Sequence, residues 1–140
     1  GAGASSMFGV ILGTGCGGAL VHAGGLIDGP LGIAGEWGHN PLPWADAQER
    51  PGPECWCGRK GCMETWVSGP ALTEDHGRIT GVALTAEQIA AAAATGDASA
   101  SATLQRHASR LARGLAAIVN IFDPDVIVLG GGLSKLAHLY

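Results

Sequence analysis

Short apolar segments separated by glycines predict a small antiparallel sheet at the start of the chain. The run Met7–Leu12 leads into residues 13–18, four of which are glycine, and apolar residues resume at 19–21. A second turn at residues 23–25 contains two glycines and precedes a short segment, residues 26–28. Glycine supplies the positive φ angles that tight turns require, so we expect a strand–turn–strand meander.

Helical periodicity dominates the second half of the chain. Thr85 and Gln88 have the spacing of a capping box, and Gly96 is placed to end the first helix. Asp97 can cap a second helix, which Asp123-Pro124 would stop because the residue before a proline disfavours the α region. Apolar side chains recur along this second helix at three- and four-residue steps: Leu104, Ala108, Leu111, Leu115, Ile118, Val119 and Phe122. The pattern predicts a long helix with one face in the core.

An uninterrupted apolar run near the C-terminus, residues 126–129, predicts another strand. Such runs are typical of strands in sheets that are covered on both faces. The run ends in Gly130-Gly131-Gly132, and residues 133–135 resemble the start of a further helix. Strand, glycines and helix in succession are typical of nucleotide sites.

The middle of the chain, residues 29–62, shows no sustained period of a helix or a strand. It holds five of the seven prolines, three of the four tryptophans and three of the four cysteines. A loop of this length in a compact domain is usually functional or disordered, and a metal ion can reduce the entropic cost of ordering it. Helical character returns only weakly at residues 63–67. We therefore expect a metal to order this segment.

The charge balance and the cysteine pattern exclude several classes of partner. Eight basic against twelve acidic residues give a formal net charge of −4, without the basic stripe that a nucleic-acid backbone requires. The longest apolar run, Ile89–Ala94, is far shorter than the roughly 20 residues of a membrane span. Three closely spaced cysteines are more typical of metal thiolates than of disulfides, which favours a reducing cytoplasm. We expect neither nucleic acid nor a membrane as a partner.

Four residues of the middle segment have the spacing of a zinc site. His39, Cys55, Cys57 and Cys62 supply one imidazole and three thiolates, beside glycines that let the backbone fold tightly around an ion. The alternative is a set of ordinary buried thiols with an unrelated surface histidine. A closed site does no chemistry at the metal, so zinc would order the loop and orient His39, whose second ring nitrogen could contact a ligand. Cys16, in the glycine turn, is expected to be a small packing residue.

Two glycine turns are candidates for contacts with a nucleotide: Gly13-Thr14-Gly15 and Gly130-Gly131-Gly132. Glycine lets backbone N–H groups approach phosphate oxygens without a Cβ in the way. Neither turn has the Walker spacing. Each has a plain alternative, because the first can be a simple hairpin turn and the second can relieve close packing.

Two glutamates lie close to the expected zinc ligands in sequence. Glu36 precedes His39 by three residues and Glu64 follows Cys62 by two, so an ordered loop would bring both carboxylates together as acceptors for sugar hydroxyls. The alternative is that both are solvated surface residues. The other acidic residues of the segment are expected at the surface: Asp46, Glu49 and Glu54. The four tryptophans are expected to pack the loop rather than to stack on a sugar: Trp37, Trp44, Trp56 and Trp66.

Three motifs together resemble the ROK family of sugar kinases and sugar-responsive repressors, over nearly all of the chain. Residues 12–18 (LGTGCGG) look like the family's second phosphate loop, and residues 123–132 (DPDVIVLGGG) look like its adenosine motif. Residues 35–39 (GEWGH) with residues 55–64 (CWCGRKGCME) resemble the family signature, which is the most specific of the three. Within the family, residues 35–44 are most similar to bacterial fructokinases of the mannokinase type.

The resemblance implies an α/β, actin-like ATPase fold of the ribonuclease H type. Residues 1–140 would form the second, C-terminal lobe of a two-lobed kinase, with residues 36–64 as its sugar and zinc loop. ATP and Mg²⁺ would occupy the cleft, zinc would be structural, and a hexose, preferably fructose, would be phosphorylated at its 6-hydroxyl. Glu36, His39 and Glu64 would bind the sugar, and both glycine turns would touch the nucleotide. The resemblance also implies a homodimer.

Two motifs of the family have no counterpart in the chain. These are the amino-terminal phosphate loop Asp-x-Gly-x-Thr and an Asn-Asp pair whose aspartate acts as the general base. Both are expected upstream of Gly1, so no residue is assigned as catalytic and we expect a fragment that does not turn over alone. Three alternatives stay open: a kinase for N-acetylglucosamine, mannose or glucose; the effector-binding half of a ROK repressor; and a zinc-stabilised structural domain without a ligand.

Overall fold

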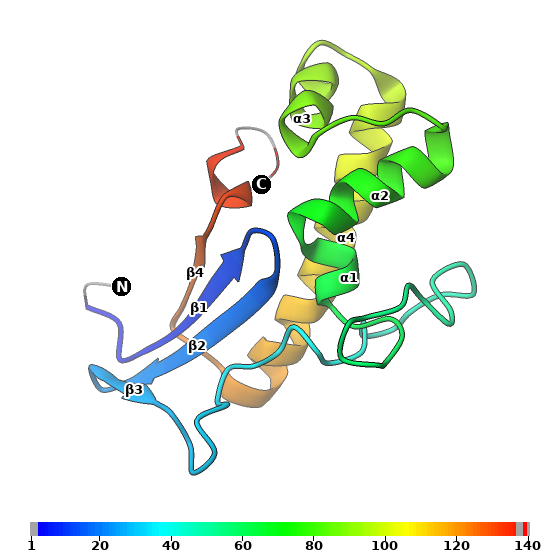
Figure 1. The fold of residues 1–140 in the computed structure, drawn as a ribbon. Coiled ribbons are helices and arrows are strands. Elements are labelled where there is room, and N and C mark those ends of the chain that lie inside the picture. Colours follow the sequence, from blue (N-terminus) through cyan, green and yellow to red (C-terminus); the bar gives the residue numbers. More distant parts are fainter. Residues whose placement is uncertain (1–2, 137–138, 140) are drawn as a thin grey trace.

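A computed structural model describes residues 3–136 and 139 and places a mixed sheet beside a group of helices (Figure 1). The sheet has the strand order β3-β2-β1-β4, with β1 (Ser6–Leu12), β2 (Cys16–His22), β3 (Gly25–Ile27) and β4 (Val126–Gly130). The helices are α1 (Glu64–Val67), α2 (Gly69–Thr80), α3 (Ala86–Ala94) and α4 (Ala98–Phe122), and a 3-10 turn, η1, covers Leu133–Lys135. None of the helices in the described part of the chain is long and apolar enough to cross a membrane.

The predicted hairpin is present, and its register brings the two glycine turns to one edge of the sheet. β1 and β2 are antiparallel and are joined by residues 13–15, and β3 adds a third antiparallel strand. β4 lies on the other side of β1 and runs parallel to it, with Ile11 paired to Gly130. Because parallel strands end at the same edge, the turn after β1 and the glycines after β4 become neighbours.

The two helices predicted in the second half begin at the capping residues that the sequence indicates. The Thr85 hydroxyl accepts the N–H of Gln88 at 3.2 Å, and the Gln88 side chain accepts the N–H of Thr85 at 2.8 Å, which completes the capping box of α3. The Asp97 carboxylate caps α4 by accepting the N–H of Ala100 at 2.7 Å. α4 ends before Asp123, whose φ of 47° takes the chain out of the helix.

Helix α2 is not predicted by the hydrophobic pattern, which indicates helix only weakly at residues 63–67. In the structure α1 covers this stretch, and α2 follows at once after Ser68, whose hydroxyl accepts a backbone N–H at 3.3 Å. The buried face of α2 includes a carboxylate, Asp75, so apolar periodicity is too weak to reveal the helix. The local signals were its cap, Pro70 in the first turn and Gly81 at the end, with a φ of 73°.

The hydrophobic core lies between the sheet and the helices, and α1, α2, α3 and α4 all contribute side chains to it. β1 turns Phe8, Val10 and Leu12 into this core, where all three are fully buried together with side chains of α4. Alternate residues of a strand point to opposite faces, and on the other face Ile11 is 57% and Val128 40% exposed. The expectation that β4 is covered on both faces is therefore wrong for the described residues, which cover one face only.

The middle segment has neither helix nor strand between β3 and α1, as its lack of period predicts. Two of the tryptophans pack it as expected, since Trp37 is 2% and Trp66 5% exposed. The expectation is wrong for the other two, because Trp44 is 63% and Trp56 80% exposed.

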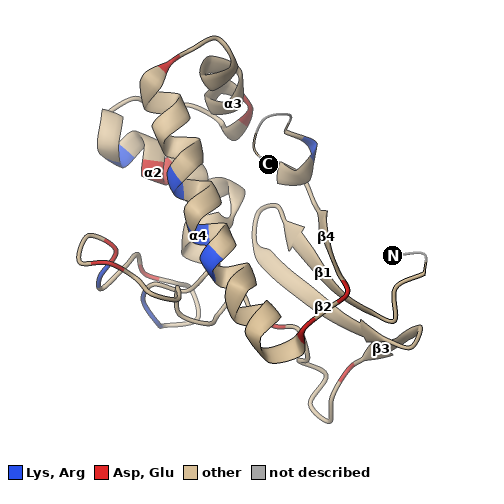
Figure 2. Ribbon diagram, turned by 180° about the vertical axis from the view of Figure 1, so that it is seen from behind, with Lys and Arg blue, Asp and Glu red and all other residues tan. Residues whose placement is uncertain are grey.

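Glu49 is buried, which corrects the expectation that it lies at the surface. Its carboxylate accepts hydrogen bonds from Arg110 at 3.0 Å and Arg113 at 2.6 Å, both on α4. Arg110 also contacts Asp75 of α2 at 3.1 Å, so the middle segment, α2 and α4 share one charge network. Figure 2 marks the acidic and basic positions along the ribbon of α2 and α4. Buried charges need partners, and α4 supplies them here. Asp46 and Glu54 are exposed, as expected.

Removal of the Glu49 charge should destabilise the protein in a pH-dependent way. The hydrogen-bonded guanidinium of Arg113, together with Arg110, lowers the pKa of Glu49 to about 2. A carboxyl whose folded pKa is depressed contributes stability above its unfolded pKa and loses it as the pH falls towards 2. Glu49→Gln should therefore lower the free energy of unfolding by about 2 kcal/mol at pH 7. The difference from wild type should shrink steadily below pH 4.5.

Urea unfolding between pH 2.5 and 7 measures this difference. Glu54→Gln is the matched control, because Glu54 pairs with Lys60 across an exposed contact in which its own side chain is 82% accessible. Exposed pairs contribute little, so the control should match wild type at every pH. Equal stabilities of Glu49→Gln and wild type at pH 7 would contradict the role given to the network.

Candidate metal and ligand site

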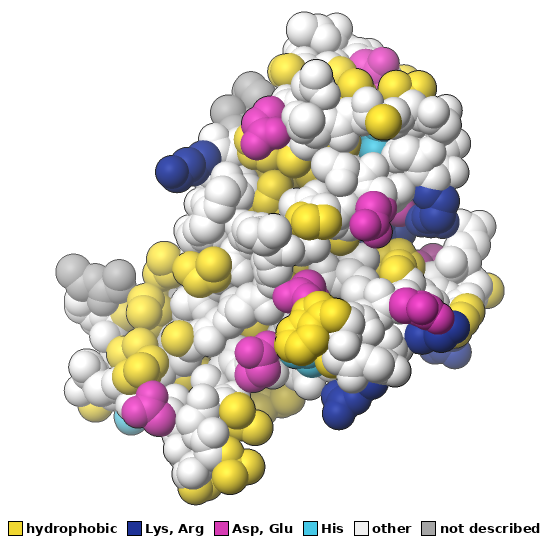
Figure 3. All heavy atoms as spheres, in the orientation of Figure 1, with side chains coloured by type: hydrophobic (Ala, Val, Ile, Leu, Met, Phe, Trp, Pro, Cys, Tyr) yellow, Lys and Arg dark blue, Asp and Glu magenta, His cyan; other side chains and the backbone are white. Residues whose placement is uncertain are grey.

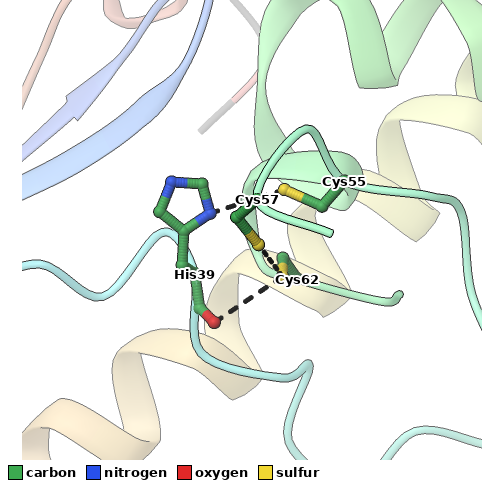
Figure 4. A group of neighbouring side chains, drawn as sticks. All are labelled: His39, Cys55, Cys57 and Cys62. Carbon is green, nitrogen blue, oxygen red and sulfur yellow. Dashed lines mark hydrogen bonds between the residues drawn. The ribbon is translucent and has the colours of Figure 1, made fainter. Parts of the chain in front are cut away.

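The four residues predicted as zinc ligands come together in the structure. His39 lies on the segment that follows β3, whereas Cys55, Cys57 and Cys62 lie on the loop that leads into α1 (Figure 4). One donor atom of each residue lies within 4.8 Å of the other three. All the cysteines are free thiols. Two separate segments of the chain therefore build one compact set of nitrogen and sulfur donors.

The distances within this cluster fit a four-coordinate zinc ion. Zinc–sulfur bonds of about 2.3 Å in a tetrahedron place two sulfurs about 3.8 Å apart. The Sγ atoms of Cys57 and Cys62 lie 3.7 Å apart, and Cys55 Sγ lies 3.4 Å from His39 Nδ1. Nδ1 faces the sulfurs while the rest of the imidazole points away from them (Figure 4). Nε2 of His39 is thus left outside the cluster.

Glycines and backbone hydrogen bonds shape the cysteine loop. The N–H of Cys55 donates to Arg59 O at 2.8 Å and the N–H of Gly58 donates to Cys55 O at 2.9 Å, which closes a tight turn. Gly58 and Gly61 have φ angles of 85° and 71°, where a side chain would strain the backbone. Gly61 also packs against Gly52, because a Cβ on Gly52 would lie only 2.5 Å from the Cα of Gly61. The loop therefore depends on glycine for both conformation and space.

Trp37 and Gly38 fix the position of the neighbouring His39 against β2. The indole N–H of Trp37 donates to Gly17 O at 2.9 Å. A Cβ on Gly38 would collide with the carbonyl oxygen of Cys16, so only glycine allows the segment to lie this close to the strand. His39 consequently enters the cluster from a backbone that the sheet holds in place.

Glu64, the first residue of α1, is held from two sides. Its Oε2 accepts the backbone N–H of Cys16 at 3.0 Å, and its Oε1 accepts the indole N–H of Trp56 at 2.7 Å. Its own N–H donates to Gly38 O at 2.9 Å, which ties α1 to the segment that carries His39. Glu64 therefore lies between the start of β2 and the cysteine loop.

The two carboxylates predicted to bind the sugar, Glu36 and Glu64, lie close to Cys16. Burial and then the negative charges of Glu64 and Glu36 raise the pKa of its thiol to about 12. Glu36 is exposed, and its Oε1 lies 3.4 Å from the position of a Cβ on Gly38. The structure thus places the two carboxylates around the first residue of β2. Cys16 itself is 5% exposed and packs in the core, as predicted.

The two glycine turns lie side by side at the edge of the sheet. A Cβ on Gly13 would be 4.0 Å from Gly132 N, and one on Gly131 would collide with the backbone of Leu12. Gly69, the first residue of α2, donates its N–H to Gly13 O at 2.7 Å. The plain alternatives for these glycines therefore hold in part, because the first turn closes a hairpin and Gly131 relieves close packing.

A small cavity connects the first glycine turn with the region of the predicted sugar carboxylate. It has a volume of about 160 Å³, and Thr14, Cys55, Trp56 and Glu64 are among its lining residues. On the face drawn in Figure 3, acidic side chains adjoin a protruding hydrophobic side chain above the loop that leads into α1. Two larger cavities of about 440 and 490 Å³ adjoin the arginine network and are lined by none of the predicted site residues.

Sequence reasoning missed the groups that hold Glu64. The sequence predicts that Trp56 packs the loop, yet its side chain is exposed and donates to the carboxylate. The available signal was its position between Cys55 and Cys57, where a metal would fix the backbone on both sides. The Cys16 N–H carries no signal in the sequence, because its direction follows from the hairpin register.

The cluster should bind about one zinc ion per chain, and each cysteine ligand should be required. Cys57→Ala should abolish stoichiometric zinc in the purified protein and lower its melting temperature, because the middle segment loses its main constraint. Elemental analysis and thermal melts measure both effects. Cys16→Ala is the control and should keep its zinc. Full zinc occupancy in Cys57→Ala would exclude the four-ligand site.

Thiol reactivity should separate Cys57 from the buried thiols of Cys16 and Cys62. With zinc bound, no thiol should react readily with an alkylating agent at pH 8. After chelation Cys57 should react, because the backbone N–H of Arg59 lowers the pKa of its thiol, whereas Cys16 and Cys62 should stay slow, because burial raises the pKa of both thiols to about 12 and only a thiolate is nucleophilic. Mass spectrometry of the alkylated protein counts the modified sites. Rapid labelling of Cys16 in the folded protein would contradict its placement.

Comparison with known proteins yields one family and one fold. The sequence profile of the ROK family matches residues 1–140. An N-acetyl-D-glucosamine kinase of Pectobacterium carotovorum is 40% identical over 139 residues, which are 96% of this chain and 45% of that protein. Further curated relatives that are 36% and 41% identical carry the same description. The chain thus spans less than half the length of the curated relatives it matches.

Two solved structures carry the same architecture. A ROK family glucokinase from Streptomyces griseus, in complex with glucose and AMPPNP, is 29% identical with a TM-score of 0.83, covering 98% of this chain and 47% of that one. A ROK family transcriptional regulator, a homologue of the Escherichia coli MLC protein, is 29% identical with a TM-score of 0.79, covering 96% of this chain and 35% of that one. The chain has the mixed α/β architecture of a lobe of the actin-like ROK kinase fold, carries a His/Cys₃ cluster, and belongs to the ROK family.

Proposed function

We propose that this chain is the sugar- and zinc-binding lobe of an ATP-dependent sugar kinase, and that the sugar is N-acetylglucosamine. One observation carries the first part: Glu64 lies between the metal cluster and the cavity that reaches Thr14 of the glycine turn. The curated relatives carry the second, because they are described as N-acetyl-D-glucosamine kinases. They favour this alternative over fructose, and the similarity of residues 35–44 to fructokinases gains no support from them.

The sugar would be held by groups of complementary chemistry. Ionised carboxylates only accept hydrogen bonds, so Glu64 and Glu36 would each take sugar hydroxyl protons. His39 would offer Nε2, the ring nitrogen outside the cluster, with its protonation fixed by the ligand bond at Nδ1. These three residues surround the start of β2, where a bound sugar would bridge them.

The nucleotide would lie along the glycine turns. Five of the six residues at positions 13–15 and 130–132 are glycines without a Cβ, and α2 starts beside Gly13, to whose carbonyl oxygen the N–H of Gly69 donates. Both features favour phosphate groups. The glucokinase of similar fold contains AMPPNP, which supports ATP with Mg²⁺ as the phosphoryl donor. The general base is proposed to lie outside residues 1–140, since none of the described carboxylates has the expected sequence context.

Zinc would act on structure and not on the phosphoryl group. Four protein donors leave no open coordination position, and such closed sites are structural. Held in this way, Cys55 and Cys57 fix the loop that carries Trp56, and His39 is fixed on the opposite side. The metal would thereby supply order to a segment without regular secondary structure.

A sugar-responsive regulator is a second candidate. The solved regulator has the same fold as this chain, and its sequence identity to this chain equals that of the glucokinase. Such a protein would bind the sugar through the same residues without phosphorylating it. The described site residues suit both functions, so turnover decides between them.

The full-length gene product should phosphorylate N-acetylglucosamine with ATP more efficiently than glucose, mannose or fructose. Glu64→Gln should lower kcat/KM by about 10- to 100-fold, the usual effect of losing hydrogen bonds to a charged group. Glu87→Gln is the control, since Glu87 is exposed on α3 and is remote in sequence from the sugar and zinc loop and from the glycine turns. A coupled assay for ADP release measures all four sugars.

The possible failures of this experiment are distinct. Preference for fructose would refute the proposed substrate and support the substrate implied by the similarity of residues 35–44 to fructokinases. Sugar binding by calorimetry without ADP release would refute the kinase and favour the regulator. Unchanged kcat/KM in Glu64→Gln would remove this carboxylate from the sugar site.

A further inference from the structure

Trp56 is the most exposed of the large hydrophobic side chains in the middle segment, although both of its neighbours are buried or half-buried cysteines of the cluster. At 80% exposure the indole contributes almost nothing to the core. Trp37, at 2% exposure, shows that the same segment can bury this residue type. The side chain of Trp56 therefore needs an explanation other than packing.

Its contacts are with two of the proposed sugar ligands. The indole N–H donates to Glu64 Oε1 at 2.7 Å. The indole also meets the imidazole of His39 edge to face, with ring centroids 4.7 Å apart at 87°. Each contact is a favourable arrangement, a hydrogen bond to a carboxylate and a T-shaped ring pair. One exposed residue thus touches both the carboxylate and the imidazole.

The Glu64 carboxylate is clamped between the two loops of the site. On the sheet side, Oε2 accepts the N–H of Cys16, and Gly15 lies so close that a Cβ there would be 2.6 Å from the same oxygen. On the other side, only Trp56 donates to Oε1 among the described residues. Without the indole N–H, the carboxylate could rotate about its remaining bond to Cys16.

We propose that Trp56 is a positioning residue for the sugar, which fixes the Glu64 carboxylate and the His39 ring in the orientation that receives the sugar hydroxyls. This inference rests on the proposed function. A carboxylate oxygen has two lone pairs, so Oε1 can accept the indole N–H and still accept a sugar hydroxyl. Holding the acceptor in place lowers the entropic cost of binding, which is the general advantage of a preorganised site.

The position of Trp56 also predicts that metal binding at the cluster affects the affinity for the sugar. Trp56 stands between Cys55 and Cys57, so a metal bound to both thiolates fixes the backbone from which the indole reaches Glu64. Loss of the metal would release the indole, and sugar affinity would fall through the same carboxylate. His39 links the metal to the sugar site in a second way, because its ring contacts both Trp56 and Cys55 of the cluster.

The test is a double-mutant cycle in the full-length gene product. Trp56→Phe keeps a ring against His39 but removes the donor to Glu64, so KM for N-acetylglucosamine should rise about five- to tenfold, with kcat changed less than about twofold. In a Glu64→Ala background the same substitution should change KM by less than about twofold, because the acceptor of the indole N–H is already absent. Zinc content and melting temperature should equal those of wild type.

Trp44→Phe is the matched control. Trp44 is exposed in the same segment, but its backbone carbonyl oxygen accepts a hydrogen bond from Arg113, away from the proposed sugar ligands. Its KM should be that of wild type.

Each outcome decides one question. An unchanged KM in Trp56→Phe, with KM raised in Glu64→Gln, overturns the positioning role and leaves the proposed function intact. Equal effects of Trp56→Phe in both backgrounds also overturn it, because the tryptophan then acts independently of Glu64. Loss of zinc in Trp56→Phe assigns the residue to the metal loop instead. Absence of sugar phosphorylation by wild type refutes the proposed function, and the inference falls with it.

Discussion

The His39 and cysteine cluster is the constraint on which the proposed ligand site depends. Residues between β3 and α1 form neither helix nor strand, so few repeating backbone bonds offset the entropy of ordering them. The four donors close this segment on itself, and they do so between His39, which β2 holds, and Cys62, which precedes α1. A donor set that fits zinc therefore joins the sheet to the helices at the place where the carboxylates meet.

A second constraint acts on the far side of the same segment. Glu49 reaches α4 through Arg110 and Arg113, and Arg110 continues to Asp75 of α2. Replacing one partner leaves buried charges without compensation, which is why such networks are costly to break even where they add little net stability. The segment is thus tied at one end by metal-type donors and in its middle by ion pairs, and the cysteine loop with Trp56 extends from this frame.

The sequence predicts those features that depend on local spacing. Thr85, Asp97 and the Cys-x-Cys-x4-Cys pattern each determine a cap or a turn from a few neighbouring residues, and the structure confirms all three. The failures concern contacts between distant segments. Burial of Glu49 requires arginines more than 60 residues away, and the buried polar face of α2 hides its helical period. The contacts of Trp56 with Glu64 and His39 likewise join separate parts of the chain.

The geometry also places the glycine turns close to the two carboxylates. The parallel register of β1 and β4 places both turns at one edge, and the hairpin directs the Cys16 N–H from that edge towards Glu64. Glu64 N–H in turn binds Gly38 O, next to the metal-facing imidazole. A shift of the hairpin by one residue would reverse the direction of Cys16 and detach the carboxylate. Strand register, rather than any single side chain, therefore sets the distance between the proposed nucleotide and sugar contacts.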